Sequence, residues 1–148
     1  TKDFEHFSRV FHLCGRDVLM WSGIELLCLP LLALGGVGFV SAVANLAPAA
    51  VAEMYDAWTS GDQERALDLH YALHPLVDLM FVETNPGPIK HVLASSGLIG
   101  SGFVRPPLVP ATDRAIEVID RLLVEGAPLL TEPLERLVVA SAEAGGTR

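Results

Sequence analysis

The uncharged run Leu26–Ala52 constrains the fold more than any other feature of the sequence. A membrane-spanning helix needs about 20 consecutive apolar residues, so the run is long enough to cross a bilayer. Its interior argues against a span, because Pro30 and the pair Gly35-Gly36 interrupt a helix, and no aromatic belt or basic flank accompanies it. We therefore interpret the run as protein interior. The alternative, a small membrane protein, predicts dependence on detergent.

Three shorter elements account for the run. Ile24–Leu34 is apolar nearly all round, which is typical of a buried helix, and Gly35-Gly36 is expected to end it. Val37–Val43 is short and β-rich without polar alternation, as in a strand that is covered on both faces of a parallel sheet. Pro48 suits the first turn of a helix expected over Ala49–Thr59.

A second strand-length run, Asp17–Trp21, lies upstream and follows an amphipathic helix predicted over Asp3–Leu13, which Gly15 ends. The apolar face of this helix is formed by Phe4, Phe7, Val10 and Phe11. Helices and strands thus alternate, which predicts parallel strands with right-handed crossovers. Because two strands cannot form a stable parallel sheet, we expect the end of a larger α/β architecture.

Only helices are expected after Val43. Asp62 should cap a long helix that reaches Glu83 and bends at Pro75. The residues expected to face inward from it are Leu67, Tyr71 and Leu76. Further helices are predicted over Pro88–Ser96, from Thr112 or Asp113 through Val124 with an apolar stripe of Ile116, Ile119, Leu122 and Leu123, and over Glu132–Ala144.

The acidic composition limits the partners of the protein. A net charge of −8 at pH 7 argues against binding to nucleic acid and to anionic membrane surfaces, because both repel a negative protein. Cys14 and Cys28 stand in apolar surroundings, and no secretion signal is recognisable. We therefore expect two buried, reduced thiols and a cytoplasmic location.

Several polar residues could carry chemistry, and each has a simpler structural explanation. His70 and His74 have the spacing of a metal-binding pair, but no third ligand follows at a recognisable spacing, so a helix-surface pair is favoured and no metal is expected. Glu83 could act as a general acid or base, or could hold a loop. Lys90 could form a Schiff base only if its amine were desolvated in a pocket, and a structural role is favoured.

The ends of the two predicted strands indicate where a ligand would bind. Ser22 follows the first strand, and residues 40–45 close the second. Ligands of parallel α/β folds bind at the carboxyl ends of strands, so both segments point to a pocket that this chain completes in part. Ser22 could equally be a turn residue that caps the next helix.

Three longer segments occur in a recognisable order: WSGIELLCLPLLALGGVGFVSAVANLAP, GDQERALDLHYALHPLVDLMFVETNPGPIKHVLASSGLI and FVRPPLVP. Together they resemble the motifs of the dihydrodipicolinate synthase / N-acetylneuraminate lyase family, over about Asp3–Leu123. The resemblance implies a (β/α)8 barrel with C-terminal helices, usually assembled as a homotetramer. On this basis residues 1–60 are expected to supply the last two barrel strands, residues 61–126 the C-terminal helical region, and residues 127–148 an extra helical tail with a frayed end.

The resemblance also implies chemistry. Family enzymes form a Schiff base between a strand lysine and pyruvate or another 2-oxo acid, and the resulting carbanion adds to an aldehyde or imine or is released by cleavage. The lysine is expected just before Thr1, so no catalytic residue and no cofactor are expected in this chain.

Three residues are expected to bind substrate. Val40 matches the residue whose backbone carbonyl lies beside the lysine and pyruvate, and Gly23 matches a small residue at the adjacent strand end. Glu25 could contact the second substrate or cap its own helix, while Ile24 stands where the family carries an acidic residue.

We therefore expect the C-terminal portion of a Schiff-base-forming lyase that is inactive alone. The alternative is a catalytically incomplete product that acts as an assembly or regulatory partner of full-length subunits, because unpaired strand edges recruit other strands.

Overall fold

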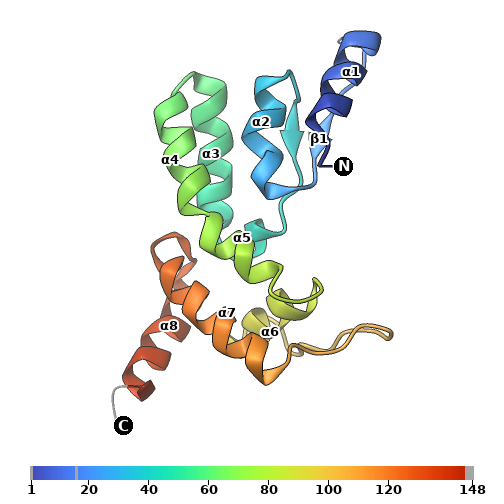
Figure 1. The fold of residues 1–148 in the computed structure, drawn as a ribbon. Coiled ribbons are helices and arrows are strands. Elements are labelled where there is room, and N and C mark those ends of the chain that lie inside the picture. The colour runs from blue at the N-terminus through green and yellow to red at the C-terminus, as the bar shows by residue number, and fades with distance from the viewer. Residues whose placement is uncertain (1, 16, 146–148) are drawn as a thin grey trace.

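Helices make up most of the chain, and the two strands are short (Figure 1). The computed structural model describes the backbone of residues 2–15 and 17–145 and the side chains of residues 2–15 and 17–138. In chain order the elements, with η for a 3-10 helix, are α1 (Phe4–Cys14), β1 (Trp21–Ser22), η1 (Glu25–Leu27), α2 (Cys28–Ala33), β2 (Gly38–Phe39), η2 (Val43–Asn45), α3 (Pro48–Ser60), α4 (Gln63–Ala72), α5 (His74–Met80), α6 (Gly87–Ser95), α7 (Asp113–Glu125), η3 (Ala127–Leu129) and α8 (Glu132–Gly145).

The strands β1 and β2 pair in parallel, as predicted, with Trp21 opposite Gly38. Two further backbone bonds extend the ladder: Val37 N donates to Met20 O at 2.9 Å, and Val40 N donates to Ser22 O at 2.8 Å. A Cβ atom at position 38 would lie 3.0 Å from Trp21 Cδ1, so the close approach of the indole ring explains the glycine.

The predicted strand bounds were wrong at both strands. Asp17–Leu19 lie outside β1, and Val43 belongs to η2 instead of β2. Strand conformation is maintained by pairing, and each strand pairs here with a single neighbour over a few residues. The apolar runs are therefore longer than the ladder that they form.

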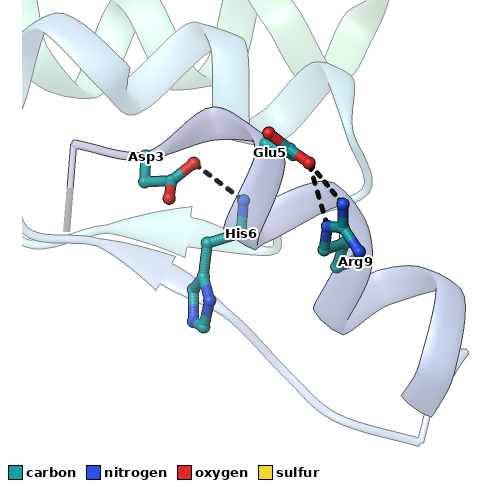
Figure 2. Close-up of polar contacts among 4 residues, drawn as sticks. All are labelled: Asp3, Glu5, His6 and Arg9. Atoms are coloured by element: carbon teal, nitrogen blue, oxygen red, sulfur yellow. Dashed lines mark hydrogen bonds and ion pairs between the residues drawn. The ribbon is translucent and has the colours of Figure 1, made fainter.

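The predicted first helix is confirmed as α1 (Figure 2). Its N-cap Asp3 accepts a hydrogen bond from His6 N at 2.9 Å, and Glu5 pairs with Arg9 one turn along the helix. No residue of α1 is buried, although all of them are described, so its apolar face has little cover. Cys14 is exposed for the same reason, and its predicted burial was wrong, whereas Cys28 is buried as expected.

The predicted helix before the glycine pair begins as η1 and continues as α2. It ends as expected, because Gly35 adopts φ +106°, a conformation that favours glycine, and Gly36 N donates to Leu31 O at 2.8 Å. The chain then turns directly into β2, which places α2 beside both strands (Figure 1).

The main hydrophobic core lies where α3 and α4 pack side by side and α5 crosses below them (Figure 1). The predicted bend is confirmed, since the chain breaks at Leu73 and Pro75 lies in the first turn of α5. Leu76 is fully buried, as expected. The inward orientation predicted for Leu67 and Tyr71 was wrong: both are exposed, and the buried positions of α4 and its end are Ala66, Leu69 and Leu73.

The helices α6, α7 and α8 form the opposite end of the molecule from α1 (Figure 1), and all three helices predicted for this part of the chain are confirmed to within two residues. Thr112 caps α7, which buries Ile119, Leu122 and Leu123. The tail joins the same core, since Leu134 of α8 is fully buried. Thr131 N also donates to Leu46 O at 3.3 Å, which ties the tail to the segment after β2.

The run Leu26–Ala52 is divided among the end of η1, α2, β2, η2 and the start of α3. Within residues 2–15 and 17–145, the structure contains no helix with the length and apolar character that crossing a membrane requires.

Candidate functional site

The carboxyl ends of β1 and β2 lie side by side because the strands are parallel and in register. Ser22, at the end of β1, is buried, and its Oγ accepts a hydrogen bond from Ile24 N at 3.1 Å and donates one to Ile24 O at 2.8 Å. These bonds make Ser22 a turn residue, and it does not cap η1 or α2 in the part of the chain that is described. Of the two roles considered for Ser22, the structure therefore favours the turn.

Glu25 carries a buried carboxylate beside these strand ends. Its side chain is 8% exposed, and Oε1 accepts a hydrogen bond from Ala42 N at 2.7 Å and a longer one from the Ser41 hydroxyl at 3.5 Å. The carboxylate therefore bridges from the start of η1 to the turn that follows β2. It does not cap its own helix.

Val40 and Gly23, the other two expected substrate-binding residues, lie at the same end of the strands. The Val40 side chain is 72% exposed, while its backbone N–H is bonded to Ser22. Gly23 is also exposed, and a Cβ atom there would meet no described atom within 4 Å. The structure thus brings all three residues to one edge of the sheet, with Glu25 inside and the other two open to solvent.

A small cavity of about 10 Å³ lies beside Glu25, and its lining also includes Ser41, Cys28 and His70. This volume suits roughly one water molecule, so the cavity is not a pocket for an organic substrate. Burial and the nearby Glu25 carboxylate raise the pKa of Cys28 to about 12, against a smaller opposing effect of the hydrogen bond with Ser22. The thiol is therefore protonated at neutral pH and is a poor nucleophile.

His70 and His74 pack edge to face, with ring centroids 5.2 Å apart. Burial lowers the pKa of His70 below its usual value, and the neighbouring His74 lowers it further. His74 Nε2 is buried and has no hydrogen-bond partner among the described residues. Both histidines are half-buried and flank the bend before Pro75, and the described residues hold no group of three or more metal-binding side chains.

Glu83 and Lys90 have structural roles in this arrangement. Glu83 accepts hydrogen bonds from Thr112 N at 3.1 Å and from the Thr112 hydroxyl at 2.7 Å, while Thr112 Oγ1 accepts from Ala115 N at 3.2 Å. Glu83 thereby holds the loop that leads into α7. The Lys90 ammonium donates to Phe103 O and holds the same long loop further along.

Sequence reasoning missed Tyr55, and it placed Ser41 and Ala42 at the end of the second strand without predicting their contacts with Glu25. The Tyr55 hydroxyl donates to Val37 O at 3.1 Å, and its ring packs edge to face against Phe39, so α3 braces β2. No spacing in the sequence indicates these contacts, because each joins residues more than fifteen positions apart.

Two parallel strands with helices packed against them are the arrangement of an α/β protein. In α/β folds of this kind, ligands bind at the carboxyl ends of the strands. The sequence pattern of the dihydrodipicolinate synthetase family matches residues 1–125. The chain therefore belongs to this family, as the resemblance indicated.

Two relatives illustrate the match. The 4-hydroxy-tetrahydrodipicolinate synthase of Methanopyrus kandleri is 48% identical over 121 residues, which cover 82% of this chain and 40% of the relative. That of Thermodesulfovibrio yellowstonii is 45% identical over 106 residues, which cover 72% of this chain and 36% of the relative. The chain thus spans about two fifths of the length of these relatives.

Solved structures agree with the family assignment. The 4-hydroxy-tetrahydrodipicolinate synthase of Methylacidiphilum fumariolicum SolV superposes with a TM-score of 0.81 at 31% identity, over 92% of this chain and 45% of that one. The chloride-inhibited dihydrodipicolinate synthase of Acinetobacter baumannii, solved in complex with pyruvate, gives a TM-score of 0.78 at 28% identity, over 88% of this chain and 44% of that one.

Proposed function

We propose that this chain is the C-terminal part of a Schiff-base-forming lyase that acts on pyruvate or a related 2-oxo acid. The observation that carries the proposal is the family match over residues 1–125, in which the two strands end together as a ligand site requires. The relatives are named 4-hydroxy-tetrahydrodipicolinate synthase, and one solved neighbour binds pyruvate.

The proposed reaction begins when a lysine amine attacks the ketone carbon of the 2-oxo acid. Water leaves, and the protonated imine withdraws electrons, so a proton can be lost from the adjacent carbon to form an enamine. The enamine carbon adds to an aldehyde or imine, and hydrolysis releases the product and regenerates the amine. Cleavage is the reverse sequence.

In this scheme the described residues form one wall of the site. The backbone carbonyl of Val40 faces the bound 2-oxo acid, which is consistent with a side chain that points to solvent. Gly23 leaves space at the adjacent strand end, and Glu25 stands beside both. The imine-forming lysine precedes Thr1, so the isolated chain is inactive.

The proposal places β1 and β2 as the last two strands of a (β/α)8 barrel in an enzyme that assembles as a tetramer. Exposed apolar side chains around the strands, such as Leu19 and Trp21, support it, because barrel strands are covered on both faces. An open groove of about 460 Å³ also lies beside the strands, and its lining includes Trp21, Phe39 and Tyr55.

Borohydride trapping with pyruvate tests the proposal. The isolated chain should gain no mass, whereas a complex with the part of the Methanopyrus kandleri relative that this chain does not match should be modified on a lysine of that part. Lys90→Arg serves as the control for adventitious reaction. Trapping on Lys2 or Lys90 of the isolated chain would contradict the assignment of the nucleophile.

A second candidate function is that of an assembly or regulatory partner of full-length subunits, and the open edge of β2 with its groove favours it. Size-exclusion chromatography with and without the complementary part distinguishes the candidates from a self-sufficient protein. A stable monomer that does not bind the complementary part would contradict both functions.

A further inference from the structure

We propose that Glu25 is a positioning residue that fixes the turn Ser41–Ala42 after β2, and that it acts through the backbone rather than by touching substrate. The role of this turn in binding a substrate rests on the function proposed above. The contact itself does not, because it is a property of the described chain.

The first support is the geometry of the carboxylate. Glu25 Oε1 accepts from Ala42 N at 2.7 Å and from the Ser41 hydroxyl at 3.5 Å, so both of its donors belong to one turn. A hydrogen bond from a backbone N–H to a carboxylate is charge-assisted and is stronger than a neutral one. Ala42 N would otherwise lack this acceptor at a partly buried position.

The second support is the way in which the turn is held on both sides. Val40 N is bonded to Ser22 O at the end of the strand ladder, and Ala42 N is bonded to Glu25 two residues later. The peptide group that carries the carbonyl of Val40 lies between these two anchors. Its direction is therefore set by one backbone bond and by one side-chain bond, and Glu25 supplies the second.

The third support is the small surface that Glu25 offers to a ligand. The residue is 8% exposed, and the cavity beside it has a volume of about 10 Å³, roughly one water molecule. A substrate at the open strand ends would meet Val40 and Gly23, which are exposed, before it reached the carboxylate.

Amide hydrogen exchange and NMR chemical shifts test the inference on the 148-residue chain. In Glu25→Ala, exchange of the Ala42 amide should accelerate about ten- to a hundredfold, the change expected for loss of a charge-assisted hydrogen bond. The carbonyl ¹³C resonance of Val40 should also shift. Glu25→Gln keeps an oxygen at the same position and should restore most of both signals.

Glu53→Ala is the matched control, because Glu53 is an exposed glutamate whose side chain pairs with Arg65 on the neighbouring helix. It should leave Ala42 unchanged. The amide of Leu69, in the buried face of α4, reports global stability and should change less than Ala42 in Glu25→Ala. Equal acceleration at Ala42 and Leu69 in Glu25→Ala, or no local effect, would overturn the inference.

A measurement on the unaltered protein remains informative if Glu25→Ala does not fold. In the unaltered protein the Ala42 amide should be protected from hydrogen exchange by its bond to Glu25, and exchange at the rate of an unstructured chain would overturn the inference. Failure of imine trapping in the complemented protein, with the Ala42 signals as expected, would remove the proposed function alone. Successful trapping with an unresponsive Ala42 would remove the positioning role alone.

Discussion

Residues 2–42 and residues 43–138 belong to one chain but bury their apolar side chains very differently. The first region holds α1, which has no buried residue, and a two-strand ladder with exposed neighbours such as Leu19 and Trp21. The second region surrounds fully buried side chains such as Leu76 and Ile119. The α2 helix of the first region also joins this core through Leu29 and Leu32. The contrast therefore lies in α1 and the surroundings of the strands, which have the apolar surface of an interface.

The largest effect expected from this contrast is that of Leu76→Ala. Leu76 is fully buried, so its truncation should lower the free energy of unfolding by about 2–5 kcal/mol. Leu19→Ala, at a side chain that is 63% exposed, should change it by less than about 0.5 kcal/mol. Urea unfolding followed by circular dichroism measures the free energy of unfolding of both variants. Equal losses would contradict the distinction between the regions.

The next effect concerns how tightly the helical core is packed. Gly126 has φ −86°, which alanine adopts without strain, but a Cβ atom there would lie 2.4 Å from Leu76 Cδ2. Gly126→Ala should therefore cost about 1–3 kcal/mol through overpacking. Gly100→Ala, in open space, is the control. If the new Cβ atom meets Leu76, Gly126→Ala should lower the free energy of unfolding much less in the Leu76→Ala background than in the wild type. Equal losses in both backgrounds would argue against direct contact.

A smaller effect is expected at the loop that leads into α7. Thr112→Ala removes the cap of the helix and the hydroxyl that Glu83 binds, and it should cost about 1–2 kcal/mol in the urea midpoint analysis. Thr59→Ala changes an exposed threonine whose hydroxyl bonds to its own helix. A similar loss in both variants would mean that the Glu83–Thr112 contact contributes little.

The smallest effect should be a pH dependence at the junction of the two regions, where His70 meets the cavity beside Glu25. Because the pKa of His70 is lowered in the folded protein, the unfolded chain binds the proton more readily. The stability contribution is complete above a pH of about 6.5 and is lost as the pH falls below it. Urea midpoints between neutral pH and pH of about 5 should therefore fall more steeply for the wild type than for His70→Gln. Parallel slopes would contradict this, and His6→Gln, at an exposed histidine, should behave like the wild type.

The order of the elements could be read from the sequence because it depends on local signals. Asp3 and Asp62 cap their helices, and Pro75 lies in the first turn of another, as their side chains favour. Gly35 ends a helix because glycine adopts a positive φ without strain. The strand lengths could not be read, since pairing between separate segments determines them. Likewise, the packing of α3 determines which face of α4 is buried, and so Tyr71 is exposed.

The positions of the candidate residues relative to the strand ends were predictable, but their contacts were not. The rule that ligands lie at strand ends located Gly23, Glu25 and Val40 together. The partner of Glu25 is the Ala42 amide, seventeen residues away, and no pattern in the sequence specifies that bond. A glutamate that looks available for binding in the sequence is already engaged in the fold.

The tail has a practical consequence for anyone who prepares shorter versions of this protein. The match to the family's sequence pattern stops at residue 125, yet Leu134 is fully buried and Thr131 is bonded to Leu46. A truncation after residue 125 would remove the packing of α8 against α7 and the hydrogen bond between Thr131 and Leu46. The end of the family match and the end of the packed structure therefore differ in this protein. Shortened versions for expression should keep the residues that pack, including Thr131 and Leu134.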